Sequence, residues 1–313
     1  MRKVFVKSAV SITCLDTFLK ENLEEVKKSV FVEKKLVEPN YKDYIAPAMI
    51  RRSSKVMKMS LASSQACMEG TDAEDLGAII VGSGLGCLMD TEKFLHSSIT
   101  AESDSLIPPL AFIQSGHNAV SGQIALQLKN QQYNMTHVQK GLSFEYSLLD
   151  AVLRIKEGNK AVMLGAVDEY IVHLDELAQR MAWPDELREQ LSEGCSFFVL
   201  SEEETDAAIE VLEVKTVQTQ NLIDELDTLL AGHSLTFESS LSNFVGFNEL
   251  PVVDLEFPHQ VYTEWVGRYF TSSAFGFHLA YDTLKNRGKS GDFCTVLNFS
   301  DAQFSSIVVL RRV

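Results

Sequence analysis

The stretch NMTHVQKGLSFEYSLLDAVLRIKEGNKAVMLGAVDE, Asn134 to Glu169, decides the fold, because it contains a strand, a turn, a helix and a second strand in unbroken order. Residues 134–139 alternate like a short strand, and 143–157 carry apolar residues at helical spacing. Residues 161–167 are typical of a buried parallel strand. We expect Gly141 to supply the tight bend. Such a bend often presents a Ser or Cys nucleophile, but here it offers a glycine.

Composition indicates a large globular protein with no need of disulfides. The chain has 313 residues, 45% hydrophobic and 23% charged, so it can bury roughly three quarters of its unfolded surface. Its five cysteines contain no CxxC pair and are typical of reduced core thiols, which predicts a cytoplasmic protein. The basic, then apolar, N-terminus fits a strand better than a signal peptide. No apolar run approaches the roughly 20 residues of a membrane span.

The net charge of −15 argues against a general nucleic-acid surface. One local basic patch occurs in RRSSKVMKMSLASSQACM, at Arg51, Arg52, Lys55 and Lys58. It is either a solvated helix face or a docking point for an acidic partner.

The rest of the chain alternates strand and helix signals. The GxGxG cluster at 82–86 lacks the spacing and the acidic ribose partner of a dinucleotide fingerprint, so no cofactor is expected. The histidines have no HExxH spacing, so no metal site is expected. The further segments we expect are strands at 4–13, 76–81, near 251–257, 293–299 and 305–311, and helices at 53–69, near 117–129, 174–180, 185–191, 221–230 and 273–286.

Several segments, in this order, carry a resemblance to a known family: RRSSKVMKMSLASSQ, GAIIVGSGLGCLMDTEKF, the stretch quoted above, EGCSFFVLSEE, FTSSAFGFHLAYDTLK and VLNFSD. Together they resemble the β-ketoacyl synthase family of the thiolase superfamily across nearly the whole chain. The resemblance implies an α/β, thiolase-like layered αβαβα fold with two pseudo-symmetric halves. The halves would be 1–204 and a shortened 205–313.

The resemblance also implies that the reacting groups are missing. The family's nucleophilic Cys falls at Gly141 and its second His at Phe270, so no catalytic residue is expected at either position. Some relatives place Gln at the nucleophile site, which makes Gln139 of interest. His259 is the closest candidate for the first His, either functional or simply a surface or partly packed side chain.

Without these reacting groups, the chain resembles a chain-length factor. Such a factor is an inactive family member that pairs with an active β-ketoacyl synthase in type II polyketide or fatty-acid-like biosynthesis, including that of aryl polyenes. The strand before the nucleophile position would lie at the heterodimer seam. An acyl carrier protein would dock at the basic patch or through the partner. The candidates for the acyl tunnel or interface are Met135, His137, Gln139, Phe144, Tyr146 and Leu148, and core packing is the plain alternative for the large ones.

Two other functions remain open. One is a malonyl-thioester decarboxylase that uses Gln139 or His259, although such a reaction needs two donors on the thioester oxygen. The other is a homodimeric acyl-binding or scaffold protein without a ketosynthase partner.

Overall fold

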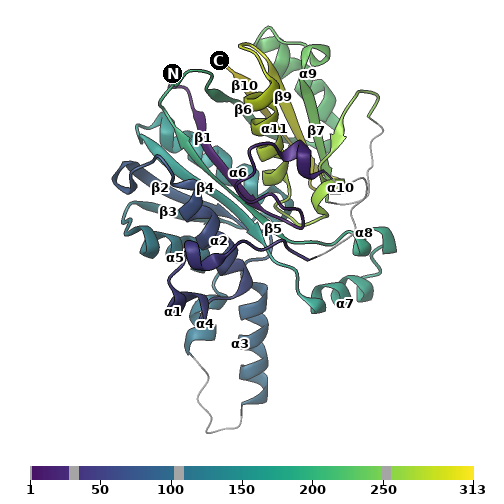
Figure 1. Ribbon diagram of the computed structural model, residues 1–313. Helices are drawn as coiled ribbons and strands as arrows, with labels where there is room; N and C mark the ends of the chain where they lie inside the picture. The colour runs from purple at the N-terminus through teal and green to yellow at the C-terminus, as the bar shows by residue number, and fades with distance from the viewer. Residues whose placement is uncertain (1, 28–34, 102–108, 249–254) are drawn as a thin grey trace.

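The computed structural model describes residues 2–27, 35–101, 109–248 and 255–313 (Figure 1). Its strands form one ten-stranded mixed sheet in the order β3-β2-β4-β5-β1-β6-β10-β9-β7-β8. The strands are β1 (Phe5–Ile12), β2 (Leu76–Gly82), β3 (Tyr133–His137), β4 (Ala161–Asp168), β5 (Gly194–Ser201), β6 (Ile209–Gln218), β7 (Ser242–Phe247), β8 (Gln260–Val261), β9 (Phe293–Phe299) and β10 (Phe304–Arg312).

The strands in the middle of this sheet are antiparallel to their neighbours. β5 is antiparallel to β4 and β1, β6 is antiparallel to β1 and β10, and β10 is antiparallel to β9. The pairs β2–β3, β2–β4, β7–β8 and β7–β9 are parallel. The two five-strand groups meet only through a short antiparallel pairing of β1 with β6, at Phe5↔Glu210 and Val6↔Ile209. Parallel strands need crossover connections, and helices supply most of them here.

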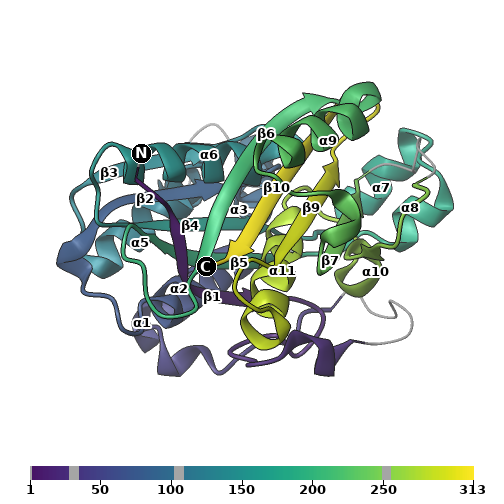
Figure 2. The ribbon, with the colours of Figure 1, turned by 90° about the horizontal axis from the view of Figure 1, so that it is seen from above.

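The helices of the described residues cover both groups of strands. They are α1 (Pro47–Ile50), α2 (Lys55–Cys67), α3 (Leu88–Thr100), α4 (Pro109–Ser115), α5 (Ala119–Leu128), α6 (Ser143–Lys156), α7 (Val172–Arg180), α8 (Asp185–Glu189), α9 (Leu222–Gly232), α10 (Thr263–Val266) and α11 (Ser273–Arg287). Figure 2 shows β3 at one end of the molecule and α7, α8 and α10 together at the other.

Three hydrophobic clusters separate the layers. One lies between α2, α5 and the first strand group, and another between α9 and the second group. The largest cluster surrounds α6 and α11, which pack between the two groups. α11 is buried from Ser273 to Leu284. Because this helix is covered nearly all round, its sequence lacks the one-sided apolar stripe of a surface helix.

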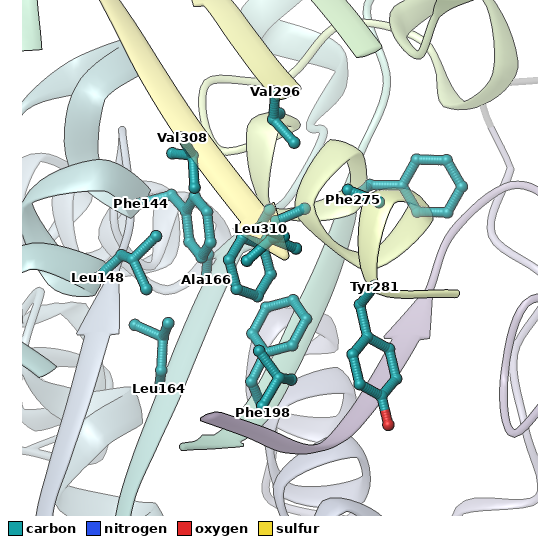
Figure 3. Close-up of a cluster of buried hydrophobic side chains, with 14 of the residues drawn as sticks. Phe144, Leu148, Leu164, Ala166, Phe198, Phe275, Tyr281, Val296, Val308 and Leu310 are labelled. Carbon is teal, nitrogen blue, oxygen red and sulfur yellow. The ribbon is translucent and has the colours of Figure 1, made fainter. Parts of the chain in front are cut away.

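Aromatic rings fill the centre of the largest cluster (Figure 3). Phe277 of α11 contacts Phe144 of α6 and Phe198 of β5, with ring centroids 5.5 and 4.9 Å apart. Leu148, one turn after Phe144, is fully buried in the same cluster. Phe144 and Leu148 are therefore packed in the core of the single chain.

Most expected elements are confirmed, including the whole strand–turn–helix–strand order from β3 to β4. The strand expected near 251–257 lies largely outside the described residues, and its described part, 255–257, forms no strand. The strand of this region is β7, which the sequence analysis missed. Helix α4 was also not expected. No helix within the described ranges is both long enough and apolar enough to cross a membrane.

A buried polar chain links the central helix α11 to the first strand group. The Ser11 hydroxyl lies 2.7 Å from both the Ser196 hydroxyl and Nδ1 of His278. Burial lowers the pKa of His278 to about 3, and the charge of Lys285 acts in the same direction. Because the site is closed to solvent, this serine–histidine pair is structural.

The neutral His278 predicts a loss of stability in acid. The unfolded chain binds a proton at His278 below a pKa of about 6.5, whereas the folded chain does not until about 3, so stability falls as pH falls through this window. Between pH 7 and pH 5 we expect a loss of about 2 kcal/mol from this group. Urea unfolding at both pH values should find that loss reduced in His278→Asn and retained in His96→Asn, an exposed control. Equal losses in the two variants would contradict the assignment.

Candidate functional site

The turn between β3 and α6 holds a strained residue. Lys140 has a left-handed backbone, with φ of 51°, which costs a side-chain-bearing residue about 1 kcal/mol or more. The fully buried Ser143 supports the turn, because its hydroxyl accepts from the Gln139 amide at 2.8 Å and lies 2.7 Å from the Lys140 carbonyl. A rigid strand-to-helix turn of this kind is how many enzymes expose a nucleophile.

Gly141 has a different role from the one expected. Gly141 is not among the residues with a positive φ. The left-handed residue of this turn is therefore Lys140. A Cβ at Gly141 would lie 2.5 Å from Oγ of Ser300 and 2.6 Å from Nδ2 of Asn248. A side chain at this position would therefore meet the ends of the Ser300 and Asn248 side chains, which would have to move to make room for it.

A buried carboxyl group lies beneath Gly141. Nδ2 of Asn298 donates to the Gly141 carbonyl at 2.7 Å and to Oε1 of Glu145 at 2.9 Å, and the Ser306 hydroxyl donates to the same Oε1 at 3.0 Å. Burial raises the pKa of Glu145, and the surrounding hydroxyl and amide donors oppose that shift. The group ties α6 to β9 and β10 and has no access to solvent.

The Asp168 carboxyl group joins segments from distant parts of the chain. Its Oδ1 accepts from the Ser83 hydroxyl and from the amides of Gly84 and Leu85, at 2.9 to 3.2 Å. Its Oδ2 accepts from the amide and hydroxyl of Thr271, at 2.9 and 2.8 Å. Burial raises the pKa of Asp168, while these hydrogen bonds act in the opposite direction. The glycine loop after β2 is thus fixed to the start of α11.

The neighbouring Glu169 is also buried, and its Oε1 accepts from the Met89 amide at 2.9 Å. Burial raises its pKa to about 7. This carboxyl group lies at the start of α3, so both acidic residues after β4 act as supports for loops and helix ends.

Phe270, immediately before Thr271, is the residue that the resemblance aligns with the family's second histidine. Its Cβ and ring lie within 3 Å of where a Cβ of Gly84 would be, so the phenyl ring packs directly on the glycine loop. It can neither donate a proton nor polarise a carbonyl. Phe270 and Asn248 line a hollow together with Leu85, Asp168, Glu169, Leu174, Trp183, Leu191, Ser192, Arg268 and Tyr269.

His259 lies apart from this arrangement. Its ring is exposed, Nδ1 lies 2.7 Å from the Phe257 carbonyl, and it packs on the Phe257 ring. The residue that follows β7 directly is Asn248, whose amide Nδ2 faces Gly141. The sequence analysis did not single out Asn248 or Ser300. Each is the first residue after a strand, and Ser300 also lies within the quoted segment VLNFSD.

Gln139 lines a second hollow at the outer side of the same turn. Its volume is about 330 Å³, and its other lining residues are Val138, Lys140, Leu142, Tyr146, Ser300, Asp301 and Phe304. Gln139 and Tyr146, two of the candidates, are therefore brought together here. His259 does not line this hollow.

The remaining candidates lie on the edge strand β3. Met135 is 38% exposed. Nε2 of His137 and the Tyr133 hydroxyl both contact Oδ2 of Asp150 on α6, at 3.0 and 3.1 Å. His137 therefore anchors the edge strand to α6.

The basic patch contains residues of two kinds. Lys55 forms an ion pair with Glu193 and donates to the Tyr170 carbonyl at 3.2 Å. Its charge is therefore engaged inside the protein. Arg51 and Arg52 are exposed, and Lys58 is partly buried. The two arginines are the members of the patch that a partner could reach.

Thiol and metal chemistry have no obvious place in the described residues. All five cysteines are buried, and burial raises the pKa of Cys67, Cys87, Cys195 and Cys294 to about 12, which suppresses the reactive thiolate. In the part of the chain that the structure describes, no three acidic, histidine or cysteine residues form a metal-binding group.

Comparison with known proteins supports a ketosynthase-like fold. Residues 26–239 match the sequence profile of the family described as "Beta-ketoacyl synthase, N-terminal domain". No curated protein sequence matches the chain.

Three solved structures are similar over essentially their whole length, each at 13% identity. The ishigamide ketosynthase/chain length factor has a TM-score of 0.77, with 99% of both chains covered. The type II acyl-carrier protein and ketosynthase complex AntDE:AntF has a TM-score of 0.73, with 100% of both covered. The ketosynthase ApeO with its chain length factor ApeC, from Xenorhabdus doucetiae, has a TM-score of 0.59, with 99% of both covered. At this identity the likeness is one of fold.

The Asp168 junction predicts a strongly destabilising substitution. Asp168→Asn keeps the volume, but its amide NH₂ must face at least two hydrogen-bond donors in either orientation. We expect a loss of about 3 kcal/mol, measured by urea unfolding. Asp206→Asn, on an exposed loop, should change stability by less than about 0.5 kcal/mol. A fully stable Asp168→Asn protein would show that the junction is dispensable.

Proposed function

The chain belongs to the β-ketoacyl synthase family through its N-terminal domain, and from this premise we propose that it is an inactive, chain-length-factor-like subunit that pairs with an active ketosynthase. The observation that carries the proposal is Gly141 with its close neighbours. The ends of the Asn248 and Ser300 side chains lie within 3 Å of where a Cβ at Gly141 would be, and glycine itself carries no nucleophile, which supports a role without covalent attachment of an acyl group at this position.

The environment of Phe270 supports the same proposal. Decarboxylative condensation needs donors aimed at a thioester oxygen, and a phenyl ring packed on Gly84 supplies none. The buried, high-pKa cysteines offer no replacement thiolate. What the scaffold can still provide is shape and contact surface.

We further propose that the sheet consists of two related halves, 1–204 and 205–313, of a thiolase-like αβαβα arrangement. The order β3-β2-β4-β5-β1 is mirrored by β6-β10-β9-β7-β8 if β6 to β10 correspond to β1 to β5. Each half then has its last strand antiparallel to both neighbours. α6 and α11 would be the equivalent helices between the halves.

The proposed seam with the ketosynthase is the free edge of β3. Among the described strands, β3 and β8 each have a neighbour on one side only, and β3, with five residues, is the longer of the two. An unpaired edge is a template for pairing with another chain. Exposed apolar side chains occur on this edge and on α6: Met135, Leu149 and Leu153. Exposed apolar side chains beside an unpaired strand edge are typical of a protein interface.

Met135 and Tyr146 are the residues we propose to shape the partner's acyl tunnel, because they are near this edge and accessible. Arg51 and Arg52 are the proposed contacts for an acidic carrier protein. An independent decarboxylase is less well supported, because Gln139 lines the outer hollow and His259 does not. A homodimer through the same edge is an alternative outcome of the pairing experiment below.

A cysteine introduced at position 141 should not give the protein condensing activity. In Gly141→Cys the new Cβ collides with Ser300 and Asn248, so we expect a destabilisation of about 1 to 3 kcal/mol and slow alkylation by iodoacetamide. Gly122→Cys, where nothing lies within 4 Å of the new Cβ, should be stable and react quickly. Condensing activity of Gly141→Cys with an acyl carrier protein would refute the proposal that the site is closed.

Pairing can be tested by co-expression with an intact ketosynthase. We expect a stable mixed dimer that Met135→Asp with Leu153→Asp disrupts, because two carboxylates would be buried at the seam. Leu177→Asp, on the exposed face of α7, should pair normally. Size-exclusion chromatography measures the association, and mass spectrometry of the products should find longer chains with Met135→Ala. If neither association nor product length changes, the proposed role fails.

A further inference from the structure

Helices α3 and α4 form an arm that projects at the lower end of the molecule in Figure 1. The structure describes every residue of these two helices, and only Asp90 among them is buried. Large apolar side chains such as Leu95, Ile99 and Phe112 are exposed. Because the arm buries so little apolar surface, its position depends on the contacts made at the start of α3.

Two buried carboxyl groups lie at the start of α3. Glu169 follows β4 directly and is 2% exposed, and Asp90 is 3% exposed. Oε1 of Glu169 accepts from the Met89 amide at 2.9 Å, and Oδ1 of Asp90 lies 3.8 Å from Nζ of Lys93. The other oxygen of each group, Oε2 of Glu169 and Oδ2 of Asp90, is enclosed and has no hydrogen-bond partner among the described residues. A buried acceptor without a donor is costly, and a proton on one of these two oxygens would supply the donor that both lack.

Other charged groups near Glu169 are engaged elsewhere. Lys55 forms an ion pair with Glu193, and Asp168 accepts five hydrogen bonds of its own. Burial, with a contribution from the charge of Asp90, raises the pKa of Glu169 to about 7, and the charge of Lys55 opposes this shift. The titratable and charged groups on the segments packed against Glu169 are Lys55, Cys87, Asp90, Lys93, Asp168, Glu193 and Arg268.

We propose that Glu169 and Asp90 form a pH-sensitive switch that fixes or loosens the arm. When Glu169 is protonated, its Oε2 hydroxyl donates to Oδ2 of Asp90, so that both enclosed oxygens have a partner. When Glu169 is ionised, two negative charges repel each other in a buried site, and the first turn of α3 opens to admit water. An ionised Glu169 is the better acceptor for the Met89 amide, but that single hydrogen bond does not offset the burial of two like charges.

The direction of the pH effect follows from the raised pKa of Glu169. The folded chain holds this proton up to about pH 7, whereas the unfolded chain releases it above about 4.5. The stabilisation by the proton is therefore complete below pH 4.5 and is lost as pH rises through 7. This is opposite to the effect expected for His278. The arm should be fixed at about pH 6 and loosened at about pH 8.

The first test follows the side-chain carboxyl carbons of the full purified chain, labelled with ¹³C-glutamate, by NMR as a function of pH. We expect the Glu169 signal, identified by its loss in Glu169→Gln, to titrate with a midpoint of about 7. Asp90→Asn should lower that midpoint by about one pH unit or more. Glu186→Gln, on the exposed side of α8, should leave it unchanged. A Glu169 midpoint near its ordinary value of 4.5, or one that Asp90→Asn does not move, would overturn the proposal.

Hydrogen exchange of the wild-type chain, followed by mass spectrometry, measures the attachment of the arm and does not depend on any variant that folds poorly. After correction for the base catalysis of exchange itself, protection of the amides of residues 89–95 should fall about tenfold between about pH 6 and pH 8. Protection in α9, on the second strand group, should not change. In Glu169→Gln, which is neutral at every pH, α3 should keep its protection at the higher pH. Protection of α3 that is independent of pH in the wild type would contradict the switch. Neither measurement contains a ketosynthase, so failure of the switch is distinguishable from failure of the pairing.

Discussion

The five hydrogen bonds accepted by Asp168 are the constraint on which the site depends. They hold the glycine loop after β2 against the first residues of α11, so segments from both ends of the sequence meet at one carboxyl group. Phe270 is placed on Gly84 as a direct result. A buried acceptor surrounded by donors is costly to disturb, which explains why the loop after β2 and the segment before α11 stay together.

The region from β3 to β4 could be predicted from sequence because its signals are local. Apolar spacing defined α6, and a continuous apolar run defined β4. Strand β7 was missed because SNFVGF is short, contains a glycine and follows a polar stretch, so its apolar pattern resembles that of a loop. α4 begins at Pro109 and has only seven residues, too few for periodicity to be informative.

The content of the site was harder to predict than its position. Counting along the chain placed Gly141 correctly at the turn, but the close approach of Asn248 and Ser300 to it depends on residues that are remote in sequence. The roles of Phe144 and Leu148 were ambiguous for a similar reason. A large apolar side chain on a helix fits both a tunnel wall and a core, and its contacts with α11 depend on a segment that is remote in sequence.

The burial of every cysteine has a consequence for any assembly that this protein enters. Thiols that are kept protonated and out of solvent react slowly with peroxides and electrophiles. In the pairing that we propose, a ketosynthase with an exposed catalytic thiolate would be inactivated first under oxidative stress, while this chain would keep its structure. Loss of synthesis under such conditions would then reflect damage to the ketosynthase alone, and fresh ketosynthase would be enough to recover it.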